Sequence, residues 1–121
     1  ELKNILNQKL NSNDYDQANF ILAEIYLNDL KDFEKAIYHY NKINENSDYY
    51  SKAIFMIGYI YSNNLNQFSK AIKYYNMFLN KFKNHDLYPS VKYELDLLKN
   101  HIPIIDSLNT IANRRRGANN D

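Results

Sequence analysis

Apolar side chains recur along this chain at steps of three and four residues, the spacing that places them on one side of an α-helix. The first two apolar stripes consist of Ala18, Leu22, Ile25 and Tyr26, and of Phe33, Ala36, Ile37, Tyr40 and Ile43. A polar stretch at residues 28–32 separates them, and Asp32 at its end is placed to cap the helix that follows. The pattern predicts a helix, a tight turn and an antiparallel helix.

The same pattern is then repeated. Residues 17–44 and 52–79 are identical at 12 of 28 positions when they are aligned at a constant offset of 35. Chance matching would give roughly two or three identities, so the two segments are copies of one structural unit. A chain of such helical hairpins buries its apolar stripes only by stacking one hairpin on the next.

Small residues recur at equivalent positions, Ala23 with Gly58 and Ala36 with Ala71. Glycine inside a helix costs roughly 1 kcal/mol relative to alanine. That cost is reasonable where a neighbouring helix crosses closely, so we expect close crossings at these positions. The aromatic side chains predicted to fill the space around them are Tyr26, Tyr61, Phe33 and Phe68.

The order of residue types in each unit resembles the tetratricopeptide repeat. The two matching segments are LAEIYLNDLKDFEKAIYHY and IGYIYSNNLNQFSKAIKYY. Each unit is 35 residues long, one more than is usual in that family, and we place the extra residue in the turn within the hairpin. The resemblance implies a right-handed α-solenoid whose concave side is lined by the first helix of each hairpin.

We therefore predict an all-α fold, an α-solenoid of antiparallel helix hairpins with about two and a half to three repeats and a C-terminal capping helix. Pro103 should end the pattern and start the capping helix, whose stripe is Ile104, Ile105, Leu108 and Ile111. The predicted segments of the single domain 1–113 are 1–10 (end of a preceding second helix), 13–46 (repeat 1), 47–84 (repeat 2) and 87–113 (partial repeat and cap). Residues 114–121 are predicted to be a basic, disordered tail.

In this family the concave groove commonly holds an extended peptide or a helix of a partner protein. The resemblance assigns the groove to Phe20, Glu24, Leu27, Lys52, Phe55, Tyr59 and Tyr93. Phe20, Phe55 and Tyr93 would form an aromatic ladder along it, although packing against the neighbouring repeat explains such rings equally well. Glu24 would repel a carboxylate, which argues against the carboxylate clamp of chaperone-binding members.

Composition narrows the classes of function. The chain has 121 residues, 15 basic and 14 acidic, so its formal charge of +1 favours neither nucleic acid nor anionic lipid. It has no cysteine and no long apolar run for a membrane span. With two glycines there is no phosphate-binding loop, and the three histidines, expected at the surface, lack metal-ligand spacing. We predict a non-enzyme without cofactor, metal or catalytic residues, whose partner is a protein.

The remaining predictions concern location and assembly. Residues 75–95 resemble bacterial envelope repeat proteins, such as the tol-pal-associated periplasmic protein and the lipoprotein of the barrel-assembly machinery. This resemblance implies a periplasmic or outer-membrane-associated protein, with the cytoplasm as the alternative. A structural subunit that self-associates through its repeat ends, near Leu2, Ile5 and Leu6, is the alternative function. The Arg114–Arg116 run could contact phosphate or acidic groups, but we expect it to be solvated instead.

Overall fold

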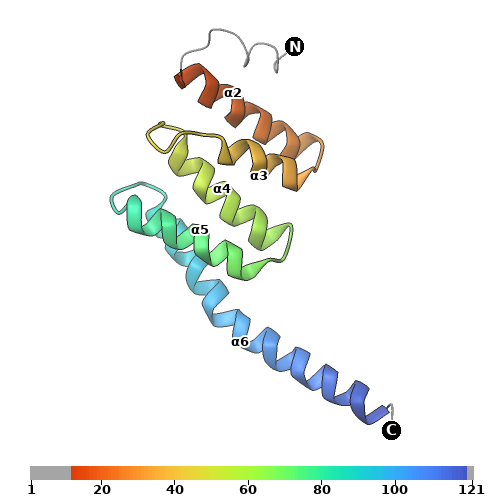
Figure 1. The fold of residues 1–121 in the computed structure, drawn as a ribbon. Helices are drawn as coiled ribbons and strands as arrows, with labels where there is room; N and C mark the ends of the chain where they lie inside the picture. Colours follow the sequence, from red (N-terminus) through yellow and green to blue (C-terminus); the bar gives the residue numbers. More distant parts are fainter. Residues whose placement is uncertain (1–11, 120–121) are drawn as a thin grey trace.

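The structure, a computed structural model, describes residues 12–119. Its elements are α2 (Ser12–Glu24), the π-helical turn η1 (Ile25–Asp29), α3 (Phe33–Asn41), α4 (Tyr50–Asn63), α5 (Phe68–Lys81) and α6 (Tyr88–Asn119). Figure 1 shows α2 to α5 side by side in one stack, with the second part of α6 extending away from it. The described residues include no β-strand, so the predicted all-α hairpin stack is confirmed. The helix predicted within residues 1–10 lies outside the described residues.

Two clusters of buried side chains hold the stack together. One joins α2, α3 and α4, and the other joins α4, α5 and α6. Helix α4 contributes to both, with Ile60 in the first cluster and Ile54 in the second. Tyr75, Phe78 and Val91 are fully buried at the centre of the second cluster. Burying a large apolar side chain stabilises a fold by roughly 1.5–3 kcal/mol, so these clusters provide most of the attraction between hairpins.

Both hairpins turn in the same way. The N–H of Asp32 donates to the carbonyl oxygen of Tyr26 at 2.8 Å, and the same bond recurs at the same length 35 residues later. Lys31 and Asn66, at equivalent positions, both have φ of 53°. This left-handed conformation is unfavourable for residues with a Cβ atom, and asparagine tolerates it best. Both turns therefore contain one residue in the left-handed conformation at the same position of the unit.

Asp32 caps α3 as predicted. Its side-chain oxygen Oδ1 accepts a hydrogen bond from the backbone N–H of Lys35 at 3.1 Å. Gln67, at the equivalent position before α5, makes no side-chain capping bond. The first hairpin therefore has a helix cap that the second lacks.

The helices cross closely at the small residues. Ala23, Ala36 and Ala71 have no exposed surface. A Cβ atom added to Gly58 would lie 2.7 Å from ring atoms of Tyr75, so only glycine fits there without movement of the ring. The predicted close crossings are confirmed.

The aromatic side chains at these crossings differ from the predicted set. Tyr40 and Tyr75 are 2% and 0% exposed and fill the centre of the two hairpins. The residues predicted for this role are only partly buried at the edges of the clusters: Tyr26, Phe33, Tyr61 and Phe68. They flank the turns, where fewer helices surround a side chain, whereas Tyr40 and Tyr75 lie one helical turn beyond the alanines of the crossing.

The C-terminal part of the chain also differs from the prediction. Helix α6 continues through Pro103 to Asn119, where a break and a separate capping helix were expected. Proline removes one N–H donor, but its fixed φ is a helical value, so a long helix can continue past it. Leu108 and Ile111 are 61% and 46% exposed, on a part of α6 that leaves the stack, so this segment does not close the core (Figure 1). The helix includes residues 114–119.

Candidate functional site

The structure places two of the seven predicted groove residues in the core. Phe20 and Leu27 are 7% and 8% exposed. The ring centroid of Phe20 lies 5.6 Å from that of Tyr40 and 5.3 Å from that of Tyr49. Lys52 Nζ lies 5.5 Å from the centroid of the Phe20 ring. Packing between neighbouring helices therefore explains Phe20, and this ring offers no open surface to a ligand.

The other five predicted residues are accessible on α2, α4 and α6. Tyr59 is 39% exposed and Tyr93 62% exposed. Phe55 is half-buried, with its ring centroid 6.2 Å from that of Tyr59. Phe20 is buried, so of the predicted ladder only Phe55 and Tyr93 keep accessible surface. We call the accessible set, together with its neighbour Glu94, the A-helix face: Glu24, Lys52, Phe55, Tyr59, Tyr93 and Glu94.

The second helix of each hairpin contributes one buried tyrosine, Tyr40 in the first and Tyr75 in the second. Burial raises the pKa of the Tyr40 hydroxyl, and the Glu24 carboxylate raises it further. Burial likewise raises the pKa of the Tyr75 hydroxyl, with added contributions from Glu94 and Tyr59, while the Ser62 hydroxyl lowers it. One carboxylate of the A-helix face therefore acts on each of these hydroxyls.

Neither the Glu24 nor the Glu94 carboxylate is paired with a cationic side chain of the described residues. Glu24 and Glu94 are half-buried and form no ion pair within residues 12–119. The ion pairs of that region lie elsewhere: Asp32–Lys35, Glu45–Lys81 and Lys92–Asp96. Lys52 is the cation of the A-helix face and lies over the Phe20 ring. The face therefore combines accessible aromatic rings with two unpaired acidic groups.

Reasoning from the sequence missed Glu94 and Tyr75. Tyr75 reads as a core residue because it belongs to a repeated apolar stripe. One difference between the two copies could have drawn attention to this region. The first hairpin has Leu27 at a position where the second hairpin has Ser62. A buried serine in place of leucine indicates polar neighbours.

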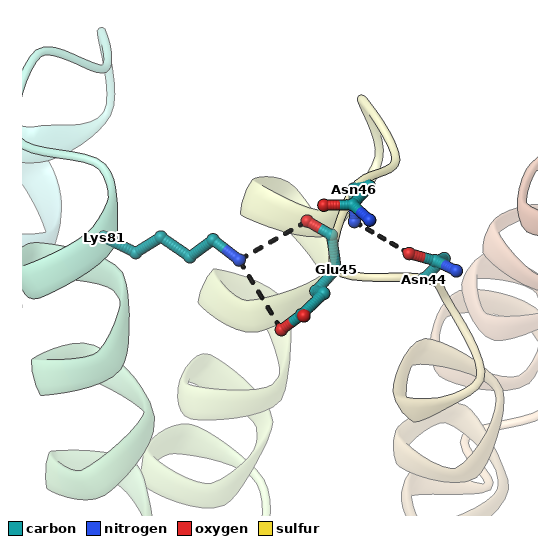
Figure 2. Close-up of polar contacts among 4 residues, drawn as sticks. All are labelled: Asn44, Glu45, Asn46 and Lys81. Carbon is teal, nitrogen blue, oxygen red and sulfur yellow. Dashed lines mark hydrogen bonds and ion pairs between the residues drawn. The ribbon is translucent and has the colours of Figure 1, made fainter.

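The loop between the two hairpins carries a separate polar pocket. In this loop the N–H of Asn46 donates to Oδ1 of Asn44 at 2.9 Å (Figure 2). Lys81 of α5 reaches the carbonyl oxygen of Glu45 at 3.5 Å and its Oε2 at 3.7 Å. The pocket has a volume of about 290 Å³ and is lined by Ser12, Asn13, Asp16, Asn44, Asn46, Ser47 and Asp48. Oδ1 of the buried Asp16 accepts a hydrogen bond from the N–H of Asn44 at 3.0 Å. This bond joins the loop to α2, so the Asp16 carboxylate has a structural role.

The histidines differ from the expectation that they lie at the surface. His39 is only 7% exposed, its Nδ1 lies 3.0 Å from Asn19 Oδ1, and its ring stacks on Tyr26 with centroids 5.3 Å apart. His85 is half-buried, with Nε2 3.1 Å from Ser51 Oγ, and His101 is exposed. Imidazole packs well in a core when hydrogen bonds satisfy its nitrogens.

No group of three or more ligating side chains suited to a metal occurs among the described residues, and no described helix combines the length and apolarity of a membrane span.

Comparison with known proteins adds one finding. The family model described as the tetratricopeptide repeat matches residues 17–47 and 52–85, which are the two hairpins. Searches of curated proteins and of solved structures returned no significant match.

Proposed function

Because this chain belongs to the tetratricopeptide repeat family, whose repeats mediate protein–protein interaction, we propose that it is a non-catalytic scaffold that binds a segment of a partner protein along the A-helix face. The bound segment is an extended peptide or a helix. Its contacts are the accessible rings and charged groups of α2, α4 and α6.

The exposure of Tyr59 and Tyr93 carries this proposal. Most large apolar and aromatic side chains of the two hairpins are buried or half-buried, whereas these tyrosines are 39% and 62% exposed. Phe55 next to Tyr59 adds a half-buried ring, and Glu24, Lys52 and Glu94 add charge around the rings. Interfaces concentrate their binding energy in aromatic residues with a polar surround.

Selection from a random linear-peptide phage library on the immobilised chain tests the proposal. Affinities of the selected peptides are then measured for the wild type, Tyr59→Ala and Tyr93→Ala. We expect each substitution to weaken binding about tenfold or more, because truncating an aromatic hot spot costs about 2 kcal/mol. Both side chains are accessible, so helical circular dichroism should be unchanged.

Tyr38→Ala is the matched control. Tyr38 is 55% exposed on α3, a second helix of its hairpin, and lies outside the A-helix face. This variant should bind the peptides as the wild type does. Equal affinities for all four proteins, or no selected peptide at all, would contradict the proposed role of the face.

A second candidate function is that of an assembly subunit that contacts further copies through its end. The exposed Leu108 and Ile111, on the part of α6 that leaves the stack, favour it. Light scattering at micromolar concentration separates this function from the first. A concentration-dependent oligomer that Leu108→Lys abolishes supports assembly, and a monomer at all concentrations rejects it.

We further propose that the scaffold acts in a bacterial envelope assembly. The support is the resemblance of residues 75–95 to envelope repeat proteins, and the cytoplasm is the alternative location. Cell fractionation of the producing organism with an antibody against the chain decides between them. Recovery in the periplasmic or outer-membrane fraction supports the envelope, and recovery with cytosolic markers rejects it.

A further inference from the structure

One face of α2 is open although the equivalent face of α4 is covered. At the constant offset of 35, Ile25 stands where the second hairpin has Ile60. Ile60 has no exposed surface and belongs to the first cluster, in which α3 packs against α4. Ile25 is 38% exposed, and Ile21, one helical turn before it, is 44% exposed. Among residues 12–119 no second helix precedes α2 to cover these two side chains, which we call the α2 end face.

The second part of α6 carries the apolar spacing of a second helix. In both hairpins the second helix and its end contribute apolar residues at steps of one, three and three, and the same steps occur after Pro103. The three sets are Ala36, Ile37, Tyr40 and Ile43, then Ala71, Ile72, Tyr75 and Phe78, and finally Ile104, Ile105, Leu108 and Ile111. The first two sets lie in the clusters between helices, whereas Leu108 and Ile111 are 61% and 46% exposed. This part of α6 therefore resembles a second helix that has no following first helix against it.

The two open surfaces differ in charge. Residues 12–30, which form α2 and η1, include four acidic side chains and no basic one. Residues 99–116 of α6 include four basic side chains, Arg114 among them, and one acidic side chain. Opposite charges attract two surfaces, and like charges disfavour the contact of either surface with its own kind. The charges therefore favour a contact between α6 and α2 over one between two α6 helices.

The two surfaces lie at opposite ends of the chain. Figure 1 shows α2 at one end of the stack, and the second part of α6 extends away from the other end. A chain with this arrangement does not place its own α6 stripe on its own α2. A second copy of the chain can supply the missing helix.

We propose that the second part of α6 of one copy packs on the α2 end face of the next copy. Leu108 and Ile111 then lie against the two exposed isoleucines of α2, and the contact removes all four side chains from water. It repeats the packing of α3 on α4, in which a second helix covers the first helix that follows it. The inference rests on the second candidate function, assembly, and names the surface that receives α6. Because the two contacting surfaces differ, the contact is heterologous.

Two complementary variants test this contact. Ile21→Lys removes the receiving surface and leaves α6 intact, whereas Leu108→Lys removes the α6 surface and leaves α2 intact. Each should weaken self-association about tenfold or more, because a cation in an apolar contact is unfavourable. Analytical ultracentrifugation should therefore show oligomers of the wild type and monomers of either variant at one concentration. An equimolar mixture of the variants should form a one-to-one dimer, since each keeps the surface that the other lacks.

Met77→Lys is the matched control. Met77 is 37% exposed on α5 and lies outside both surfaces, so this variant should associate as the wild type does. All the substituted positions are accessible, and circular dichroism should confirm an unchanged helical fold. Wild-type association should also weaken several-fold between about 0.01 M and about 0.15 M salt, because salt screens the opposite charges. Association that is unchanged or tighter in salt would contradict the charge complementarity.

The possible failures are distinguishable. A wild type that stays monomeric at all concentrations overturns this inference and the assembly function, and leaves the peptide-binding function standing. Oligomers that Leu108→Lys abolishes but Ile21→Lys does not would show that α6 contacts another surface, which overturns this inference alone. A mixture of the two variants that remains monomeric also overturns it. Failure to select any peptide on the A-helix face overturns the scaffold function and leaves the contact between α6 and α2 unaffected.

Discussion

The ring of Tyr75 lies directly against the backbone of Gly58. A Cβ atom at position 58 would come within 2.7 Å of Cδ1 and Cε1 of that ring, and within 3.4 Å of the Cβ atom of Tyr74. Since Tyr75 is fully buried, its ring has no solvent to move into. This contact sets how closely α4 and α5 approach.

Gly58→Ala should therefore destabilise the fold although alanine is the better helix former. The propensity gain is about 1 kcal/mol. Overpacking a well-filled core typically costs about 1–3 kcal/mol, so we expect a net loss of stability. Urea unfolding followed by circular dichroism measures it. An unchanged or higher free energy of unfolding would show that the Tyr75 ring moves freely.

Tyr75→Phe should leave the fold as stable as the wild type or stabilise it by up to about 1 kcal/mol. The substitution removes a buried hydroxyl that has no partner among the described residues and leaves the ring in place. The same urea titration gives the difference. A loss above about 1 kcal/mol would indicate that the hydroxyl makes a stabilising hydrogen bond in solution.

Stability should decrease at alkaline pH. Burial raises the pKa of the Tyr40 and Tyr75 hydroxyls in the folded chain above the value of about 10 in the unfolded chain. The folded state thus holds these protons more tightly, so their contribution is complete below pH 10 and is lost progressively as the pH rises above that value. Urea titrations below and above the unfolded-state pKa of about 10 should show the decrease. The double variant Tyr40→Phe/Tyr75→Phe should show a smaller decrease, and an equal one would assign the effect to other groups.

Asp32→Ala should destabilise the protein by about 0.5–2 kcal/mol, because the hydrogen bond that the N–H of Lys35 donates to Asp32 Oδ1 caps α3. The reverse change at the equivalent position, Gln67→Asp, should stabilise it, since no side chain caps the start of α5. Thermal unfolding compares the two variants with the wild type. Similar effects of the same sign would contradict the assignment of the cap.

Much of the fold could be predicted because it depends on local patterns. The apolar stripes, the cap at Asp32 and the small residues at the crossings all follow from spacing within one hairpin. The predicted break at Pro103 was wrong because the effect of a proline depends on whether the chain on both sides of it remains helical. The local sequence does not decide this. The predicted surface position of His39 was wrong because its burial depends on Asn19. That residue lies twenty positions away in the sequence and supplies a hydrogen-bond partner in the core.

The candidate site was less predictable for a physical reason. Phe20 and Phe55 are the same residue at equivalent positions, yet Phe20 is 7% exposed while Phe55 is half-buried. Tyr49 and Lys52 cover the first ring, and exposure is a property of such neighbours. Glu94 went unnoticed because its partial burial and its lack of an ion pair depend on how α6 packs.

The amino-acid sequence by itself determined the helical hairpins, their repetition and their close crossings, because steps of three and four residues and the sizes of adjacent side chains act within a single unit. Only the tertiary structure decided which aromatic rings remain accessible and that α6 leaves the stack. These features arise between units, where the burial and charge of one residue depend on side chains brought close by packing.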